Sequence, residues 1–420
     1  MIRSIYLKLP KFLRVLIAKL YYRLYFIGLL RGCLNFIKAH LFHHKNRNDI
    51  KELKKLIALA KKNKQPIFIQ FPSIPWFGTL FQRPQQFAKA MSDIGYLTIY
   101  LIPVGYEVCP FKKISDNLYL SDQHEILHDI EGAIISIYFS YPPDYLDHYL
   151  TDRFFTENIS FYEYVDHVDE EICGKYFAQI LKKRFEIIRK HSFEFILGTS
   201  RVLYEELLHL YPEKQVIYLP NGVDISHYNI TKQTVDKFIV PERLAKAIQN
   251  DKKIIGYFGA IAPWIWDELI IELSKSRPEY FILMIGPYYG DRKIFEERDN
   301  IYLPGKIDYQ DLPFYAKYFD VSIIPFRLGD IAKATSPLKL FEYFAIGKPV
   351  VVTSDLIECI KFEGVFIAST PQEFLNKVDE ATEHSYNNAL QQKYQQYAEE
   401  NSWNRRAKEL DRLINNRSKE

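Results

Sequence analysis

The sequence predicts an α/β protein made of two halves, each a parallel sheet covered by helices on both faces. Three observations lead to this fold class. Short apolar runs typical of buried strands alternate with helical segments from about residue 66 to residue 368. The alternation is interrupted once, over residues 225–249, where the chain turns polar and loses its apolar periodicity. Finally, 420 residues are enough for two or three domains with ample cores.

The N-terminal residues 1–48 differ from the rest in charge. They hold ten Lys and Arg and no Asp or Glu, which leaves 45 basic against 52 acidic residues in the remainder of a chain with net charge +3. Leu, Phe and Tyr side chains lie between these cations, a pattern typical of an amphipathic helix on anionic lipid. The alternative is a helix docked on the protein itself. A nucleic-acid partner is not expected, since nothing downstream resembles a reader of bases.

The longest uncharged apolar run in that segment, Leu24–Leu30, is too short to cross a membrane or to form the core of a signal peptide. The four cysteines are scattered without metal-binding spacing, as in reduced cytoplasmic proteins. We therefore expect a cytoplasmic protein held peripherally on the inner face of the cell membrane by residues 1–45.

The first half, residues 49–235, begins with a polar helix at 49–62. Its strands are expected at Pro66–Phe71, Leu97–Ile102, Ala133–Phe139, Asn158–Tyr164, Phe193–Leu197 and Gln215–Leu219, with helices at about 171–190 and 200–210. The second half, residues 250–386, has strands expected at 253–260, 280–286, 300–303, 320–326, 348–352 and 365–368. Residues 387–420 predict one long polar helix that returns to the first half.

Ligands bind at the carboxyl ends of the strands in open parallel sheets, so the loops there hold the candidate residues. In the first half, Asp166 and His167 follow a predicted buried strand. A carboxylate or imidazole at that place suits general base catalysis, with Asp166 as base and His167 orienting it or binding an acceptor. The alternative is that Asp166 caps the helix that follows.

The stretch from Thr335 to Val352 organises the second half as a loop, a short helix and a buried strand. Ser336 is an N-cap type, and Pro337 suits the first helical position. Lys339 is unusual in a first turn, where the helix dipole disfavours a cation, unless an anion such as a phosphate binds there. Glu342, one turn on, could accept hydrogen bonds from hydroxyls such as a ribose diol. The alternative is a surface Lys–Glu pair on a core helix.

The motif S-P-L-K-x-x-E-Y-x-A-x-G-K-P-V-V in this stretch resembles the nucleotide-sugar motif of GT-B glycosyltransferases of the family 1 and family 4 kind. The resemblance covers about residues 65–415 and implies two Rossmann-like domains facing a cleft. In that group the glutamate at the place of Glu342 binds the donor's ribose, and the helix N-terminus faces the diphosphate. Many family 4 members carry a second glutamate eight positions upstream, where this chain has Ala334, which leaves inversion or retention open.

The resemblance also implies donor contacts from the neighbouring loops. Gly259 follows a strand and lets the backbone approach a phosphate. Gly286 lies in the region that resembles the nucleotide-base site, together with Leu303–Lys306 and Leu312–Pro313. Family members often place an Arg and a Lys beside the first of these glycines. Because this chain has neither, Lys339 is expected to bind the diphosphate together with the other side chains of the region: Thr335, Ser336 and Arg327.

The first half contains a pattern, W-(x)n-Q-R-P-Q-Q-hydrophobic-A, that resembles glycosyltransferases of the teichuronic-acid and capsule type. Trp76, Gln82 and Arg83 stand beside a predicted helix start, where a tryptophan and an arginine could stack on and orient an acceptor sugar or its phosphate. The alternative is that Trp76 packs and Arg83 serves surface ion pairs.

Together these features predict a glycosyltransferase that moves a sugar from a nucleotide-diphosphate sugar to a glycan, lipid-linked acceptor included, in cell-surface polysaccharide biosynthesis. No D-x-D motif or metal-ligand spacing occurs, so neither a metal nor another cofactor is expected. Two alternatives remain: a nucleotide-sugar epimerase or hydrolase of the same fold, and a non-catalytic membrane-tethered scaffold, which the missing glutamate at Ala334 would suit.

Overall fold

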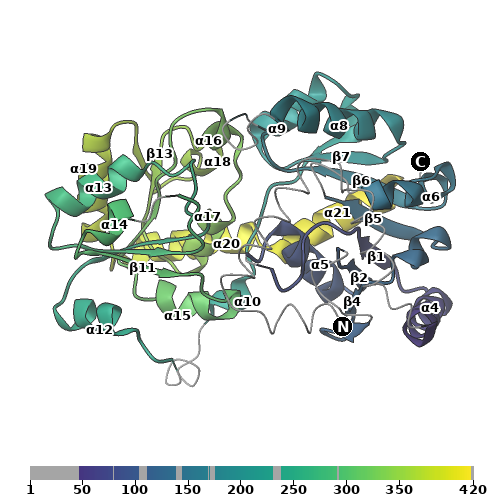
Figure 1. Cartoon of the computed structure of the whole chain (residues 1–420), viewed down its shortest axis with the longest axis horizontal. Coiled ribbons are helices and arrows are strands. Elements are labelled where there is room, and N and C mark those ends of the chain that lie inside the picture. The colour runs from purple at the N-terminus through teal and green to yellow at the C-terminus, as the bar shows by residue number, and fades with distance from the viewer. Residues whose placement is uncertain are drawn as a thin grey trace, which may run out of the picture.

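A computed structural model of the chain shows two lobes side by side, each with a sheet between helices (Figure 1). The predicted membrane-attaching segment, residues 1–45, lies outside the residues that the structure describes. These are residues 47–78, 80–103, 111–138, 144–168, 170, 176–229, 238–290 and 293–417. The two α/β domains that the sequence predicts are confirmed.

The first domain holds an eight-stranded sheet in the order β3-β4-β2-β1-β5-β6-β7-β8. All neighbouring strands are parallel except the antiparallel pair β3 and β4. The order reverses between β1 and β5, which pair directly. The strands are β1 Ile67–Gln70, β2 Leu97–Leu101, β3 Lys112–Lys113, β4 Leu118–Ser121, β5 Ala133–Ile137, β6 Ile159–Tyr164, β7 Phe195–Gly198 and β8 Val216–Tyr218.

Helices cover both faces of this sheet and bury two apolar clusters. One cluster takes side chains from α4, α8 and α9, and the other from α5 and the C-terminal helix α21. The helices of this domain are α4 Arg47–Lys62, α5 Arg83–Asp93, α6 Asp152–Thr156, α8 Phe177–Lys190 and α9 Arg201–Leu208.

The second domain holds a six-stranded, fully parallel sheet in the order β11-β10-β9-β12-β13-β14. Its strand order reverses between β9 and β12, which is the place where open α/β sheets bind ligands. The strands are β9 Ile254–Phe258, β10 Phe281–Ile285, β11 Ile301–Gly305, β12 Val321–Ile324, β13 Val350–Thr353 and β14 Phe366–Ala368. The helices are α13 Asp267–Ser276, α14 Lys293–Glu296, α15 Leu312–Ala316, α16 Asp330–Ala334, α17 Leu338–Ala345, α18 Ile357–Ile360 and α19 Pro371–Glu383.

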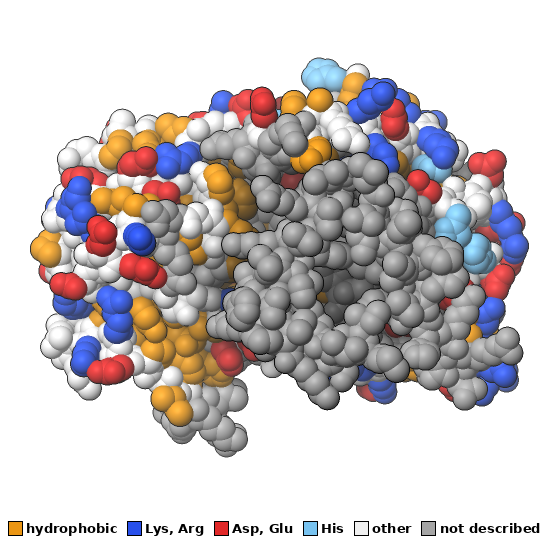
Figure 2. All heavy atoms as spheres, viewed as in Figure 1, with side chains coloured by type: hydrophobic (Ala, Val, Ile, Leu, Met, Phe, Trp, Pro, Cys, Tyr) orange, Lys and Arg blue, Asp and Glu red, His pale blue; other side chains and the backbone are white. Residues whose placement is uncertain are grey.

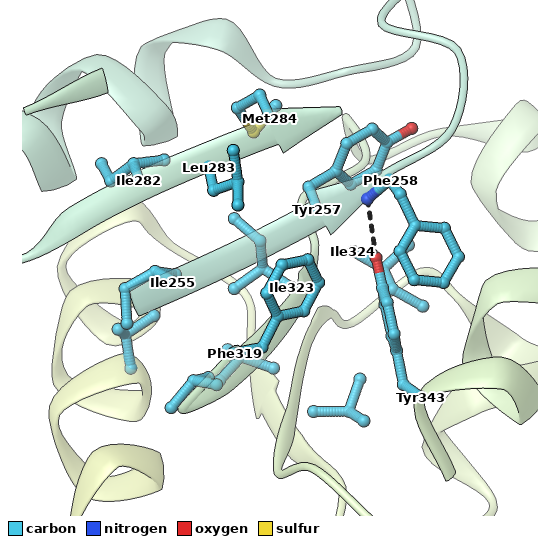
Figure 3. Packing of buried hydrophobic residues seen from close by; sticks show 14 of the residues in the cluster. Ile255, Tyr257, Phe258, Ile282, Leu283, Met284, Phe319, Ile323, Ile324 and Tyr343 are labelled. Carbon is cyan, nitrogen blue, oxygen red and sulfur yellow. Dashed lines mark hydrogen bonds between the residues drawn. The ribbon is translucent and has the colours of Figure 1, made fainter. Parts of the chain in front are cut away.

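The core of the second domain packs around β9, as Figure 3 shows. Gly256 leaves room for the Phe319 ring, since a Cβ at that glycine would lie 2.2 Å from the ring carbons. The Phe258 N–H donates to the Tyr343 hydroxyl at 3.1 Å, which ties the end of β9 to α17 (Figure 3). This bond fixes the helix of the nucleotide-sugar motif against the central strand.

The junction between the domains differs from the non-periodic linker that the sequence predicts. Its described residues, 225–229 and 238–249, include the helices α10 Ile225–Tyr228 and α12 Glu242–Gln249. Leu244 and Ala247 of α12 are buried in the core of the second domain. Two apolar residues on one face of a short polar helix are enough to dock it, although they give little periodicity in the sequence.

The C-terminal segment forms two helices, α20 Asn388–Glu400 and α21 Trp403–Arg417, so the prediction of one long helix was wrong. The chain turns at Asn401 and Ser402, where Ser402 makes a parallel bridge to Val223. Beyond that turn, α21 packs against α5 of the first domain, as the yellow helix of Figure 1 shows. Within the described residues, no helix has the length and apolar character needed to cross a membrane.

Charged side chains of both signs are mixed over the face of the molecule seen in Figure 2. The residues described on that face form no continuous basic surface. By sequence, the excess of positive charge belongs to the N-terminal segment, outside the part described.

Candidate active site

The N-terminus of α17 lies where the two domains meet. Its first residue, Leu338, packs against the apolar cluster under α5 of the first domain. The helix begins one residue later than expected, with Pro337 as N-cap, so the prediction that Ser336 caps it was wrong. Ser336 bonds instead across the domains: its hydroxyl accepts the Asn221 N–H at 3.3 Å, and its carbonyl accepts from the Asn221 side-chain amide at 2.6 Å.

Lys339 lies at the carboxyl ends of β9 and β12, the strands between which the order of the second sheet reverses. Its Nζ is 5.4 Å from the centre of the Tyr257 ring of β9 and 5.2 Å from that of Phe326, which follows β12. Aromatic faces attract a cation, but less strongly than an anion does. Lys339 makes no ion pair with the residues that the structure describes, so its ammonium can accept an anionic ligand.

Two glycines make the room in front of Lys339. Gly259, directly after β9, has φ +132°, and a Cβ there would lie 3.0 Å from Lys339 Cε. Gly286, directly after β10, has φ +146°, and a Cβ there would lie 1.9 Å from the Gly259 carbonyl oxygen. Both positions therefore need glycine for space as well as for backbone conformation. The structure thus brings Gly259, Gly286 and Lys339 together, while a phosphate contact at Gly259 and Lys339 and a base contact at Gly286 stay predictions.

Glu342 lies one turn into α17 and is 7% exposed. Burial raises its pKa to about 7, although the Tyr228 hydroxyl and Lys339 each lower it. Burial lowers the pKa of Lys339 to about 8, against the opposite effect of Glu342. The Tyr228 side chain is itself buried, and its hydroxyl faces the Glu342 carboxyl. A carboxyl this poorly solvated would be stabilised by hydroxyl donors from a ligand.

The other predicted donor residues make contacts within the protein. Thr335 donates from its hydroxyl to the Ile331 carbonyl at 2.5 Å. Arg327, after β12, pairs with Glu268 at 2.9 Å and also donates to the Pro263 carbonyl. Its side chain is 38% exposed, so this ion pair is solvated and of little energetic weight.

In the first domain, β6 ends at Tyr164, and Asp166 and His167 follow after Val165. Asp166 is exposed, yet the protein around its carboxyl raises its pKa by desolvation, with Arg184 acting in the opposite sense. The Arg184 guanidinium donates to the Asp166 carbonyl at 2.6 Å and holds the backbone there. His167 is half-buried.

Arg83 lies below the surface, where it is 1% exposed and pairs with Glu163 of β6. Glu163 also accepts from the Ser136 hydroxyl at 2.5 Å. The guanidinium donates further to the Asn221 side-chain oxygen at 3.2 Å. Asn221 thereby connects Arg83 of the predicted acceptor site to Ser336 of the predicted donor site. Glu163 and Asn221 are the polar residues that sequence reasoning missed, although an acidic residue inside an apolar strand is a signal that could have identified Glu163.

Trp76 and Gln82 complete the predicted acceptor residues. Trp76 is 7% exposed and packs edge-on against Phe81 and Tyr100, with ring centres at 5.3 and 5.1 Å. Gln82 is the N-cap of α5, and its N–H donates to the Gln85 side chain at 2.9 Å. These contacts agree with the alternative in which Trp76 packs, while an acceptor contact stays a prediction for all three residues.

Among the residues that the structure describes, no three His, Cys, Asp or Glu side chains are grouped as metal ligands would be. Whether the reaction needs a metal is a separate question, and the expectation that it does not stays a prediction. The charged groups at the two sites are Lys339 and Glu342 in one domain and Asp166 in the other.

Comparison with known proteins identifies the fold. No protein-family model matches the chain. The solved structure of sucrose-phosphate synthase from Thermosynechococcus elongatus matches with a TM-score of 0.64 and 13% identity, over 84% of this chain and 98% of that one. Anabaena HepE, solved with UDP and glucose, matches with a TM-score of 0.59 and 12% identity, over 84% of this chain and 99% of that one.

The chain has the GT-B fold. Identities this low establish the fold alone. One curated relative is more similar in sequence: 145 residues are 30% identical to TuaH of Bacillus subtilis (strain 168), which is provisionally assigned as a glycosyltransferase of teichuronic acid biosynthesis. That match spans 34% of this chain and 35% of TuaH, about a third of the relative's length.

The packing of α16 gives a structural reason for the absence of a second glutamate eight positions upstream of Glu342, where this chain has Ala334. Ala334 ends α16 and is 1% exposed. It belongs to the apolar cluster of the first domain, and α16 packs on α9 there. A glutamate at this place would bury its carboxylate against α9 at a cost of several kcal/mol, on the order of an unpaired buried charge. The position serves packing between the two GT-B domains in this chain.

Proposed function

We propose that the protein is a glycosyltransferase that transfers a sugar from a nucleotide-diphosphate sugar to a glycan acceptor. The observation that carries the proposal is the position of Lys339. Its ammonium lies beside Gly259 at the strand-order reversal of a GT-B second domain, without an anionic partner among the described residues. A diphosphate is the anion that would suit a lysine, a glycine turn and the N-terminus of a helix together.

The donor is bound, in this proposal, across α17. The diphosphate contacts Lys339 and the backbone at Gly259, and the ribose hydroxyls donate to Glu342. Gly286 and the loop after β11 border the base. Arg327 contributes only if it leaves Glu268, which a solvated ion pair permits at a cost of less than about 1 kcal/mol. The solved structure of HepE contains UDP and glucose, which makes uracil the first base to test.

The chemical step assigns roles to both domains. Asp166 accepts the proton of the attacking acceptor hydroxyl, which its raised pKa favours, since a base works best with a pKa near the operating pH. His167 orients Asp166 or binds the acceptor. Lys339 and the N-terminus of α17 stabilise the departing diphosphate, so that a bound metal is not required.

We further propose that the acceptor is a lipid-linked glycan of cell-surface polysaccharide synthesis and that residues 1–45 attach the enzyme to the cytoplasmic membrane face. The basic, aromatic-rich composition of that segment and the likeness to TuaH support this. Flotation with vesicles that contain anionic lipid tests it. The full chain should float, and high salt or deletion of residues 1–45 should release it. A truncated chain that still floats would contradict the attachment.

A thermal-shift screen with UDP-, GDP- and ADP-sugars tests the donor proposal. A ligand present at 100 times its dissociation constant adds about 2.7 kcal/mol to stability. Binding followed by transfer to a glycan supports the glycosyltransferase. Turnover of the donor without an acceptor would favour an epimerase or hydrolase. No stabilisation by any nucleotide sugar would contradict the proposal and favour a non-catalytic scaffold.

A further inference from the structure

Tyr309 belongs to the second domain but contacts the first. It begins the short 3-10 helix η5, Tyr309–Asp311, which follows β11. Its ring stacks on Phe81 beside α5, with centres 4.8 Å apart and planes at 20°. It also stacks on His227 of α10, with centres 3.9 Å apart and planes at 7°. The Tyr309 hydroxyl accepts a hydrogen bond from Gln86 of α5 at 2.6 Å.

Each side of this contact belongs to one of the candidate binding regions. The loop from Gly305 to Asp311 leaves the carboxyl end of β11, in the part of the sequence matched to the nucleotide base. On the other side, Phe81 packs against Trp76 of the predicted acceptor region at 5.3 Å. A second hydrogen bond joins the same two loops: Lys306 Nζ donates to the Gly78 carbonyl at 3.1 Å. The donor-side loop and the acceptor-side loop therefore touch directly.

The backbone of Tyr309 is held as well as its side chain. His227 Nε2 lies 2.9 Å from the Tyr309 carbonyl, and burial lowers the pKa of His227 to about 4, so that a neutral ring can donate there at neutral pH. The helix that carries His227, α10, packs against α17 of the donor site. Tyr309 is thus fixed relative to the donor site on one side and meets the first domain on the other.

The contact between Tyr309 and Gln86 suits a reversible interaction between the two domains. Gln86 is 2% exposed, its side-chain N–H bonds to Tyr309, and its oxygen has no partner among the described residues. If the two loops separate, water can replace the bond to Tyr309 and also reach that oxygen, so the loss of this one hydrogen bond costs little. Binding at the donor site can then favour the paired arrangement of these loops.

We propose that Tyr309 is a positioning residue that couples nucleotide binding in the second domain to the ordering of the acceptor-side region around Phe81 and α5. The inference rests on the proposed function, since it assigns a regulation to the same site. Nucleotide binding next to the loop after β11 holds Tyr309 against Phe81 and Gln86, and the acceptor region is thereby formed when the donor is present. By linkage, an acceptor that orders the region around Phe81 tightens donor binding by the same factor.

Hydrogen exchange measured by mass spectrometry on the full chain tests the coupling, with saturating UDP, GDP and ADP as probes. In the wild type we expect a nucleotide to slow exchange both at residues 335–345, in the donor site, and at residues 80–90, in the first domain. Tyr309→Phe removes one hydrogen bond and should reduce the slowing at 80–90 about two- to tenfold while that at 335–345 is unchanged. Gln86→Leu removes the same bond from the other side and should act alike.

Tyr386→Phe is the matched control, because it also removes one tyrosine hydroxyl bond, to Asp320, within the second domain. It should leave both regions as in the wild type. If no nucleotide slows exchange at 335–345, the proposed function itself fails. If 335–345 responds but 80–90 does not, or 80–90 responds equally in Tyr309→Phe and Gln86→Leu, the coupling through Tyr309 is overturned and the proposed function stands.

Discussion

Lys339 reaches the backbone of Gly259 so closely that a single added carbon atom on that glycine would lie 3.0 Å from Lys339 Cε and 3.4 Å from Nζ. The position of the ammonium therefore depends on the absence of a side chain at Gly259, directly after β9. Neither residue would mark a ligand site alone. Together, at the strand-order reversal of the second sheet, they place a cation beside a glycine turn.

Gly259→Ala should displace Lys339 and weaken nucleotide-diphosphate binding by about tenfold or more, the equivalent of one charge-assisted contact. The substitution also strains the backbone, because φ is +132° there. Gly95→Ala is the control, since its φ is +104° but nothing lies within 4 Å of the added carbon. Calorimetric titration should show weakened binding only in Gly259→Ala. Equal nucleotide-diphosphate affinity in the two variants would mean that Gly259 is not part of the binding site.

Stability should depend on pH through Glu342. Its pKa is raised to about 7 in the folded protein, whereas the carboxyl in the unfolded chain titrates near 4.5. Between these values the unfolded chain loses the proton while the folded one keeps it, so the free energy of unfolding falls as pH rises through this window. The loss is at most about 3 kcal/mol.

Glu342→Gln cannot titrate and should lack this dependence. Urea unfolding of the wild type and of Glu342→Gln at pH 5 and pH 8 measures it. We expect the variant to gain stability relative to the wild type between the two pH values. A constant difference would mean that Glu342 is ionised throughout and better solvated than its burial indicates.

Arg83 and Glu163 form a buried ion pair that is expected to be structural. Arg83→Met or Glu163→Gln alone leaves the partner buried without its counter-charge and should cost about 3–5 kcal/mol. The double variant Arg83→Met with Glu163→Gln should cost less than the sum of the two. Urea unfolding of the wild type, the two single variants and the double variant measures these losses in the free energy of unfolding. Losses below about 1 kcal/mol in correctly folded single variants would leave Arg83 available for the acceptor role predicted from the sequence.

The strands were predictable because their apolar runs are short, continuous and bounded by polar loops. The exceptions have physical reasons. No strand was expected at β4, Leu118–Ser121, because its four residues mix apolar and polar side chains and give only a short apolar signal. The two-residue strand Lys112–Lys113 is an exposed edge with no apolar signal, and it pairs with a strand that lies beside it in the chain. The break at Asn401 in the C-terminal helix follows from a tertiary contact, the bridge from Ser402 to Val223, which the polar sequence on either side does not announce.

The candidate site was predictable where local geometry decides it. Gly259, Lys339 and Glu342 follow from a strand, a glycine turn and a helix start in one domain. Partners drawn from the other domain were not predictable. Ser336 was expected to cap α17, but its hydroxyl and carbonyl oxygens accept hydrogen bonds from Asn221, more than a hundred residues away in the chain. Tyr309 has no signal in the sequence at all, because its stacking partners come from two other segments.

Asp166→Asn should separate catalysis from capping. Loss of a general base lowers the rate of transfer by about 10²–10⁴, whereas loss of a helix cap costs about 1 kcal/mol of stability and leaves the rate nearly unchanged. We expect donor binding and folding to persist and transfer to fall. Transfer within a few-fold of the wild type would exclude Asp166 as the base and make His167 the next residue to test.

The affinity of UDP, GDP and ADP for Lys339→Ala, measured by calorimetric titration beside the wild type, tests the donor site most directly. Lys333→Ala is the matched control, because Lys333 lies in the adjoining helix α16, half-exposed and paired with Asp330. We predict that the nucleotide bound by the wild type binds about 10- to 100-fold more weakly to Lys339→Ala and equally well to Lys333→Ala. Equal affinity in Lys339→Ala and the wild type would contradict the account.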